Sequence, residues 1–183
     1  WKRPIDEVSS LMSLFVEVLK REVKSLDENG IRVRFIGARE KLSLRLQGML
    51  ANAEEQTKTN DRMELVLAVA YGGRWDIVEA TRQLAADVQA GKLKAEDISE
   101  QHLASHLSLA GIVPPDLLIR TGGEKRISNF LLWDIAYSEL YFTPTLWPDF
   151  SAIDLEKALT FYAQRERRFG ETSEQVIARV ERI

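Results

Sequence analysis

The hydrophobic pattern of the chain switches between a helical period and a strand period. In residues 5–28 the apolar side chains recur at helical spacing, and an Asn-Gly pair ends this predicted helix. Residues 31–37 alternate apolar and basic side chains, and residues 63–71 form a nearly continuous apolar run; both patterns are typical of strands. A second helix is predicted between them, over residues 41–57. The apolar positions of the first helix are Val8, Leu11, Met12, Phe15, Leu19, Val23 and Leu26.

The second half of the chain continues this alternation. Residues 72–91 pass through two glycines into a predicted helix, and a shorter helical region is expected over residues 95–109. The apolar run PDLLIR, residues 115–120, indicates a buried strand, and a closing helix is expected from residue 153 to about residue 181. Strands that alternate with helices of ten or more residues predict an α/β fold with a mostly parallel central sheet surrounded by helices. No linker interrupts the pattern, so we predict a single domain over residues 1–183.

Composition narrows the class of protein. The 25 Lys and Arg residues nearly balance the 28 Asp and Glu residues, which argues against a general nucleic-acid binder. Any positive site must therefore be local. The absence of cysteine excludes a disulfide framework, a thiolate nucleophile and a Cys-ligated zinc site, and it suits a reducing cytosol. No apolar run approaches the roughly 20 residues that span a bilayer.

One such local positive site follows the predicted strand at residues 115–120. In open parallel sheets, ligands bind at the carboxyl ends of strands, and guanidinium groups suit phosphate oxygens. The loop therefore predicts a site for a di- or polyphosphate; the alternative is a solvated loop whose arginines pair with acids such as Glu124. Neither a Walker motif nor a dinucleotide fingerprint is present, which favours a phosphorylated ligand without a nucleoside. The loop residues concerned are Arg120, Gly122, Gly123, Lys125, Arg126 and Ser128.

Other polar candidates allow two interpretations. Glu139 lies among apolar and aromatic residues, so it is expected either to hold Mg²⁺ beside phosphate or to form a buried salt bridge with an arginine. His102 and His106 are spaced i, i+4, but no third metal ligand is near, so a solvated helix face is the better interpretation. Trp1 and Arg3 form either a frayed end or a ligand clamp. The apolar stripe of the first helix forms either core or the wall of a ligand channel, and periodicity does not separate the two.

Five segments identify a family resemblance. WKRPIDEVSSLM, AVAYGGRWDIVEA, PDLLIRTGGEKRISNFLLWDIAYSELYF, LWPDF and RERRFG occur in this order across nearly the whole chain. Together they resemble the cis-prenyltransferases, most closely the bacterial members that make undecaprenyl diphosphate. The resemblance implies the cis-prenyltransferase fold with an apolar tunnel, in a homodimer. It also implies a transferase that condenses isopentenyl diphosphate repeatedly in cis onto farnesyl diphosphate, with Mg²⁺ as cofactor.

The resemblance also assigns a setting and residue roles. The product would be the carrier-lipid precursor of bacterial cell-wall peptidoglycan, made in the cytoplasm with transient or peripheral contact with the inner membrane. No nucleic-acid partner is expected. Lys125 stands where many relatives carry histidine and receives no role, and the segments at residues 71–74 and 165–170 would be structural or dimer-contact elements. Substrate would be bound by Trp1, Arg3, Arg120, Arg126, Ile127 and Ser128; the tunnel would be lined by Leu11, Leu14, Phe15, Met63 and Leu65; and Mg²⁺ would be held by Glu139.

The chain also departs from the family pattern. The opening strand, the Asp-Gly-Asn-Gly-Arg phosphate loop and the asparagine that precedes Trp1 are absent, so no catalytic residue is assigned in this chain. We therefore expect a sequence truncated or recorded in part, inactive without its amino-terminal segment. Two alternatives are a non-catalytic subunit of a heteromeric prenyltransferase and an unrelated phosphate-binding module. Retention of Arg120, Arg126, Ser128 and Glu139 argues against the first alternative.

Overall fold

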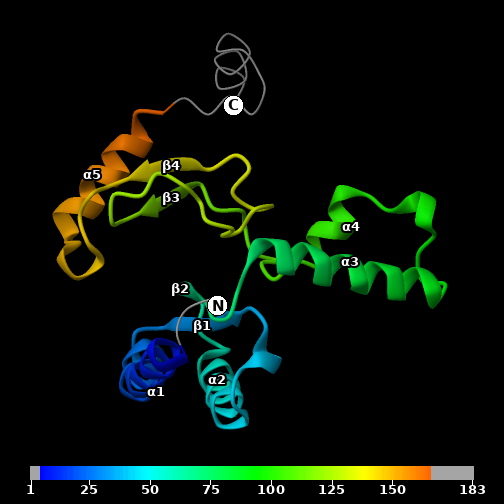
Figure 1. The fold of residues 1–183 in the computed structure, drawn as a ribbon, viewed down its shortest axis with the longest axis horizontal. Coiled ribbons are helices and arrows are strands. Elements are labelled where there is room, and N and C mark those ends of the chain that lie inside the picture. The colour runs from blue at the N-terminus through cyan, green and yellow to red at the C-terminus, as the bar shows by residue number, and fades with distance from the viewer. Residues whose placement is uncertain (1–4, 166–183) are drawn as a thin grey trace. The chain divides into compact units, whose positions relative to one another are not determined.

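The structure is a computed structural model that describes residues 5–165, without the side chains of residues 5–10 and Ser13. It divides into two compact units, Trp1–Ala110 and Gly111–Ile183 (Figure 1). The single-domain expectation stays a prediction. The helices and strands of the first unit are α1 (Ile5–Glu28), β1 (Ile31–Ile36), α2 (Leu44–Thr57), β2 (Met63–Ala68), α3 (Gly73–Gln89) and α4 (Glu100–Ala104). Those of the second unit are β3 (Leu117–Arg120), β4 (Glu139–Phe142) and α5 (Ala152–Ala163).

Both units are built on parallel strands, which confirms the predicted α/β class. In the first unit β1 pairs with β2 in parallel, from Ile31 opposite Met63 to Ile36 opposite Ala68. Helices α1 and α2 pack against β1 and against each other (Figure 1). Their apolar faces bury the core, as the helical spacing of α1 predicts. The buried residues of this core are Leu19, Val23, Val33, Phe35, Leu46, Leu50, Ala53 and Val69.

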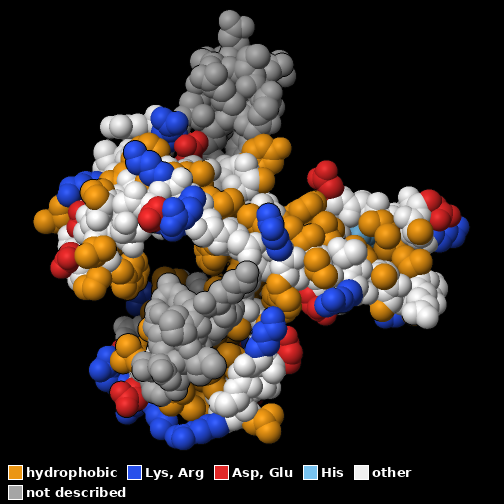
Figure 2. Space-filling view, in the orientation of Figure 1, with side chains coloured by type: hydrophobic (Ala, Val, Ile, Leu, Met, Phe, Trp, Pro, Cys, Tyr) orange, Lys and Arg blue, Asp and Glu red, His pale blue; other side chains and the backbone are white. Residues whose placement is uncertain are grey.

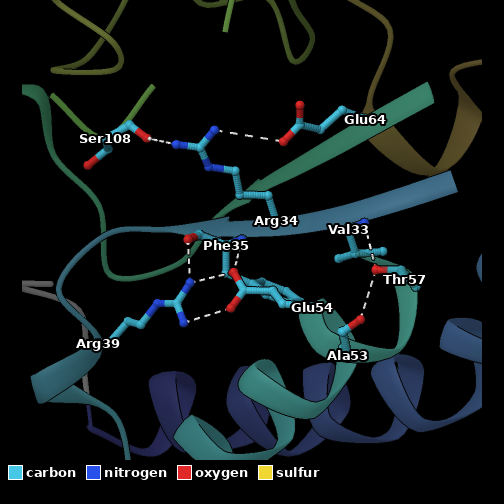
Figure 3. A network of polar contacts seen from close by, with 9 residues as sticks. All are labelled: Val33, Arg34, Phe35, Arg39, Ala53, Glu54, Thr57, Glu64 and Ser108. Atoms are coloured by element: carbon cyan, nitrogen blue, oxygen red, sulfur yellow. Dashed lines mark hydrogen bonds and ion pairs between the residues drawn. The ribbon is translucent and has the colours of Figure 1, made fainter. Parts of the chain in front are cut away.

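One edge of β1 is closed by side chains of α2. The Val33 N–H donates to Thr57 Oγ1 at 3.0 Å, and the Thr57 hydroxyl donates to the Ala53 carbonyl at 2.8 Å (Figure 3). The Phe35 N–H donates to Glu54 Oε1 at 2.8 Å. These N–H groups would otherwise be unsatisfied at a strand edge, so α2 supplies the partners that another strand would provide.

Replacing Thr57 with valine is expected to lower the free energy of unfolding by about 1–3 kcal/mol, because the nearly isosteric side chain leaves the buried Val33 N–H without its acceptor. Thr57 is fully buried. The matched control is Thr81→Val on α3, where an exposed hydroxyl donates to the Ile77 carbonyl at 2.7 Å; there we expect a change within about 0.5 kcal/mol. Urea unfolding of both variants measures the difference, and equal effects would contradict the edge-closing role.

The second unit connects its strands without a helix. Strands β3 and β4 pair in parallel, from Leu117 opposite Glu139 to Arg120 opposite Phe142. The crossover over residues 121–138 is built from turns and bends. Residues Ser128, Asn129 and Leu131 have φ of 48°, 65° and 44°, a left-handed conformation through which a right-handed helix cannot continue. The alternation of strand and helix inferred from the pattern therefore fails at this crossover.

Two further helices are shorter than predicted. The closing helix, predicted from residue 153 to about residue 181, is α5 and ends at Ala163, with Gln164 as its C-cap. The region expected over residues 95–109 contains a 3₁₀ turn at Ala95–Asp97 and only the short helix α4. The Ser105 hydroxyl donates back to the His102 carbonyl at 2.8 Å, which satisfies the helix end where α4 stops. Helix α5 packs against β4 through Tyr141 and Phe161, whose ring centroids lie 5.3 Å apart. Between residues 5 and 165 no helix is long and apolar enough to cross a membrane.

The start of α5 gives a pH prediction. The Ser151 N–H and hydroxyl donate to Asp154 Oδ2 at 3.1 and 2.8 Å, and with Lys157 they lower the pKa of Asp154 to about 2. Because the folded pKa lies below the unfolded value, this capping box stabilises α5 above about pH 4, and its contribution is lost as the pH falls towards 2. A carboxyl NMR titration should find Asp154 half-protonated near pH 2, and Ser151→Ala should raise its pKa. An ordinary Asp154 titration near pH 4 in the unaltered protein would contradict the cap.

Candidate functional site

The loop after β3 is fixed to the segment that follows β4. The Gly122 N–H donates to the Thr145 carbonyl at 2.9 Å, and the Gly123 N–H donates to the Thr143 carbonyl at 2.9 Å. Both glycines have positive φ, 85° and 78°, which glycine adopts at little cost. Their N–H groups are therefore used within the protein and are not part of an anion cradle. The glycines shape the loop instead of approaching a ligand with their amides.

Three of the predicted substrate-binding residues meet in this loop. Arg120 Nη1 donates to the Arg126 carbonyl and to Ser128 Oγ, the latter at 2.8 Å. Since Ser128 and Asn129 are left-handed, the chain turns back so that the Ser128 hydroxyl reaches Arg120. Among the described residues the hydrogen bonds of Arg120 use only Nη1, so its Nη2 and Nε remain available to a ligand.

Arg126 is paired with Glu124. This pairing was the alternative to a phosphate site in the interpretation of the sequence. Arg126 Nη1 contacts Glu124 Oε2, and both side chains are exposed, by 60% and 52%. Figure 2 shows Lys and Arg side chains next to acidic ones on the surface of the second unit. Ile127 is half-buried, and its carbonyl accepts from the Phe130 N–H at 3.1 Å. Lys125 is exposed and makes no ion pair with the described residues.

Glu139 opens β4 and forms a salt bridge. Arg165 Nε donates to Glu139 Oε2 at 3.1 Å, and the guanidinium of Arg165 lies 5.2 Å from the centroid of the Phe161 ring. No group of three His, Asp or Glu side chains within residues 5–165 could hold a metal ion. A lone carboxylate still suits Mg²⁺, which keeps waters and takes phosphate oxygens as ligands. Glu139 therefore fits one ligand of a site that a diphosphate completes, and it does not form a site by itself.

The two histidines bind protein groups instead of a shared metal. Ser99 N donates to His102 Nδ1 at 3.1 Å, which completes a capping box at the start of α4. His106 Nε2 lies 3.0 Å from Asp87 Oδ2, and hydrogen bonds from Lys92 and His106 hold the pKa of Asp87 below its usual value. The sequence favoured a solvated helix face for this pair, whereas both rings are half-buried and bonded to protein groups.

An apolar cavity of about 430 Å³ lies between α1 and the carboxyl end of β2 in the first unit. Its volume falls in the range of small-molecule sites. Leu11, Leu14 and Phe15, predicted for the tunnel, all line it. Met63 and Leu65 are not among its lining residues, because they lie at the start of β2, and Met63 is 49% exposed. Met12, part of the stripe expected to form either core or a channel wall, also lines it. Lining residues that the sequence did not indicate are Val18, Leu67, Ala68, Val69 and Ala70.

A buried carboxylate, Asp76, also escaped the sequence reasoning. It is 3% exposed and accepts from the Tyr71 hydroxyl at 2.8 Å and from the Ser108 hydroxyl at 2.7 Å. These bonds fix the turn into α3, and the structural or dimer-contact role of residues 71–74 stays a prediction. The only sequence signal was an acid in the first helical turn after a glycine pair. Trp1, Arg3 and residues 166–170 lie outside the described residues.

Comparison with known proteins identifies the class. A family model described as "Putative undecaprenyl diphosphate synthase" matches residues 1–170. A ditrans,polycis-undecaprenyl-diphosphate synthase ((2E,6E)-farnesyl-diphosphate specific) from Xanthomonas axonopodis pv. citri is 54% identical over 176 residues, which are 96% of this chain and 68% of that protein. The enzyme of the same name from Pseudomonas aeruginosa is 53% identical over 178 residues, which are 97% of this chain and 71% of that protein.

Solved structures agree with this class. Lavandulyl diphosphate synthase from Lavandula x intermedia, in complex with dimethylallyl diphosphate, has a TM-score of 0.89 and 44% identity over 93% of this chain and 74% of that one. A probable undecaprenyl diphosphate synthase from Campylobacter jejuni has a TM-score of 0.82 and 32% identity over 93% of this chain and 78% of that one. The fold is therefore that of a prenyltransferase. The chain belongs to the family of undecaprenyl diphosphate synthases, which confirms the resemblance inferred from the sequence.

Proposed function

We propose that this protein condenses isopentenyl diphosphate repeatedly, in cis, onto farnesyl diphosphate to make undecaprenyl diphosphate for peptidoglycan synthesis. The observation that carries the proposal is the convergence of Arg120, Arg126 and Ser128 in one loop at the carboxyl end of β3. Family membership and the names of relatives more than 50% identical support the choice of substrates.

In each cycle the alkene carbon of isopentenyl diphosphate bonds to the allylic carbon, and pyrophosphate leaves with the electrons of the broken C–O bond. A proton of the isopentenyl unit then passes to a base. Because the departing pyrophosphate comes from the allylic substrate, the lengthened chain keeps the diphosphate of the isopentenyl unit. Arg120 and Arg126 would orient that diphosphate through paired N–H groups, and the Ser128 hydroxyl would add one more donor. Glu139 would contribute one ligand to Mg²⁺, which neutralises diphosphate charge when bound.

The apolar cavity beside α1 would receive the prenyl chain. Burial of each added methylene stabilises the bound product by about 0.8 kcal/mol, so a wall without polar side chains suits elongation. Met63 and Leu65 stay predicted tunnel positions, and Trp1 and Arg3 stay predicted substrate contacts. The proposal also includes a homodimer and a cytoplasmic location with transient contact with the inner membrane.

Replacing Ala68 with phenylalanine is expected to shorten the prenyl chain of the product. Ala68 lines the cavity, and the phenyl ring would reduce the volume of the cavity. The control, Ala85→Phe on the exposed surface of α3, should leave product length unchanged. Chromatography of the dephosphorylated products of the full-length variants measures both. An unaltered product distribution in Ala68→Phe would argue against the cavity as the product channel.

Calorimetry of the full-length protein tests the proposal against its alternatives. Isopentenyl diphosphate should bind, and ATP should bind far more weakly because the loop lacks a nucleoside site. Preference for ATP would instead favour an unrelated nucleotide-phosphate module. Binding of isopentenyl diphosphate without any turnover would favour the non-catalytic subunit.

A further inference from the structure

The cationic side chain of Arg126 is already neutralised within its own loop. Glu124 lies two residues before Arg126 and contacts its guanidinium, and both side chains are more than half exposed. Under the proposed function, that guanidinium must be free to take phosphate oxygens. Glu124 and the diphosphate therefore compete for one partner.

Glu124 is not required to hold the loop. The backbone there is fixed by the bonds from Gly122 and Gly123 to the Thr145 and Thr143 carbonyls, and by Arg120 through Ser128. None of these contacts involves the Glu124 carboxylate. Within residues 5–165 the Glu124 carboxylate contacts Arg126. Loss of the Glu124 charge should therefore free the Arg126 guanidinium and leave the loop in place.

The proposed reaction gives this competition a use. Because the lengthened chain keeps the diphosphate of the isopentenyl unit, that diphosphate still occupies Arg126 after each condensation. It must leave before the next isopentenyl diphosphate binds. The Glu124 carboxylate, held in the same loop, can pair with Arg126 again. This pairing would shorten the time that the product diphosphate stays bound to Arg126.

We propose that Glu124 is an internal counter-ion that occupies Arg126 between cycles and speeds release of the product diphosphate from the isopentenyl site. This inference rests on the proposed function. Glu124 acts through Arg126 and is a positioning residue. An exposed ion pair contributes about 0.2–1 kcal/mol, which corresponds to a roughly 1.4- to 5-fold effect on the affinity of a competing anion.

The binding test uses inorganic pyrophosphate as the probe, without added divalent metal, on the full-length protein. Glu124→Gln should lower its Kd by about 1.4- to 5-fold, and Glu124→Asp should restore part of the competition. The matched control is Glu79→Gln, which removes an exposed carboxylate that pairs with Arg82 at 3.0 Å and should leave the Kd unchanged. In the Arg126→Ala background, Glu124→Gln should have no further effect, because the two side chains act together.

Kinetics separate this role from a merely structural one. In Glu124→Gln the KM for isopentenyl diphosphate and the steady-state kcat should both fall, while the rate of a single condensation stays unchanged. Pyrophosphate binding that is unchanged or weaker in Glu124→Gln, but still lost in Arg126→Ala, would overturn the counter-ion role of Glu124. The proposed function would then remain intact. Binding that survives Arg126→Ala would instead remove the proposed diphosphate site itself.

Discussion

Replacing Arg126 with alanine is expected to lower kcat/KM for isopentenyl diphosphate by about 30-fold or more. Arg126 can present two parallel N–H groups to phosphate oxygens, and loss of such a charge-assisted contact costs about 2–5 kcal/mol. The side chain is 60% exposed and pairs with an exposed acid, so its removal should not unfold the second unit. Steady-state kinetics of the full-length variant, with circular dichroism to verify folding, measure the effect.

Lys125→Ala is the matched control. Lys125 is adjacent, carries the same charge and is exposed, but its ammonium is a hydrated point charge on a flexible stem. We expect a loss below about 10-fold. Equal losses in the two variants would mean that the loop contributes only a positive field, and no loss in either would place the diphosphate elsewhere.

Replacing Gly37 with alanine is expected to lower the free energy of unfolding of the first unit by about 3 kcal/mol or more. Gly37 follows β1 with a φ of 119°, and a Cβ built there would lie 2.1 Å from the Val69 carbonyl oxygen. The Val69 backbone cannot move aside as a flexible side chain can, so the clash with the new Cβ persists. The strain of an alanine at this positive φ adds to the cost of the clash. Because Val69 also lines the apolar cavity, the same change should alter the cavity wall. Urea unfolding followed by circular dichroism measures the loss.

Gly48→Ala gives the opposite expectation on the same unit. Gly48 lies within α2, and a Cβ there would meet no atom within 4 Å. Alanine should therefore stabilise the helix by about 0.5–1 kcal/mol. An unchanged stability in Gly37→Ala would contradict the close approach of the Gly37 and Val69 backbones. A loss of stability in Gly48→Ala would contradict the open space at that position of α2.

The regular elements could be predicted because burial imposes their periods. The stripe of α1 places Leu19 and Val23 in the core, and the apolar run at residues 63–68 forms β2. The loop after β3 could be located because its charges directly follow an apolar run, although the strand that this run forms is half-buried and not buried as predicted. Phosphate recognition was thus inferred from residue types and from the position of the loop.

The remaining features depend on contacts between residues far apart in the sequence. Thr143 and Thr145 hold the glycines of the loop from twenty or more residues away, and Arg165, just after α5, reaches Glu139. The pattern also cannot tell which apolar positions of α1 face a cavity, because core and channel walls share one period. The crossover at residues 121–138 carries apolar residues, yet left-handed residues exclude a helix.

Incorporation of radiolabelled isopentenyl diphosphate by the full-length protein, with farnesyl diphosphate and Mg²⁺, tests the central claim most directly. We predict a ladder of products that ends at one comigrating with undecaprenol after dephosphorylation, and its loss in Arg126→Ala. Absence of incorporation, together with failure to bind isopentenyl diphosphate, would contradict the account.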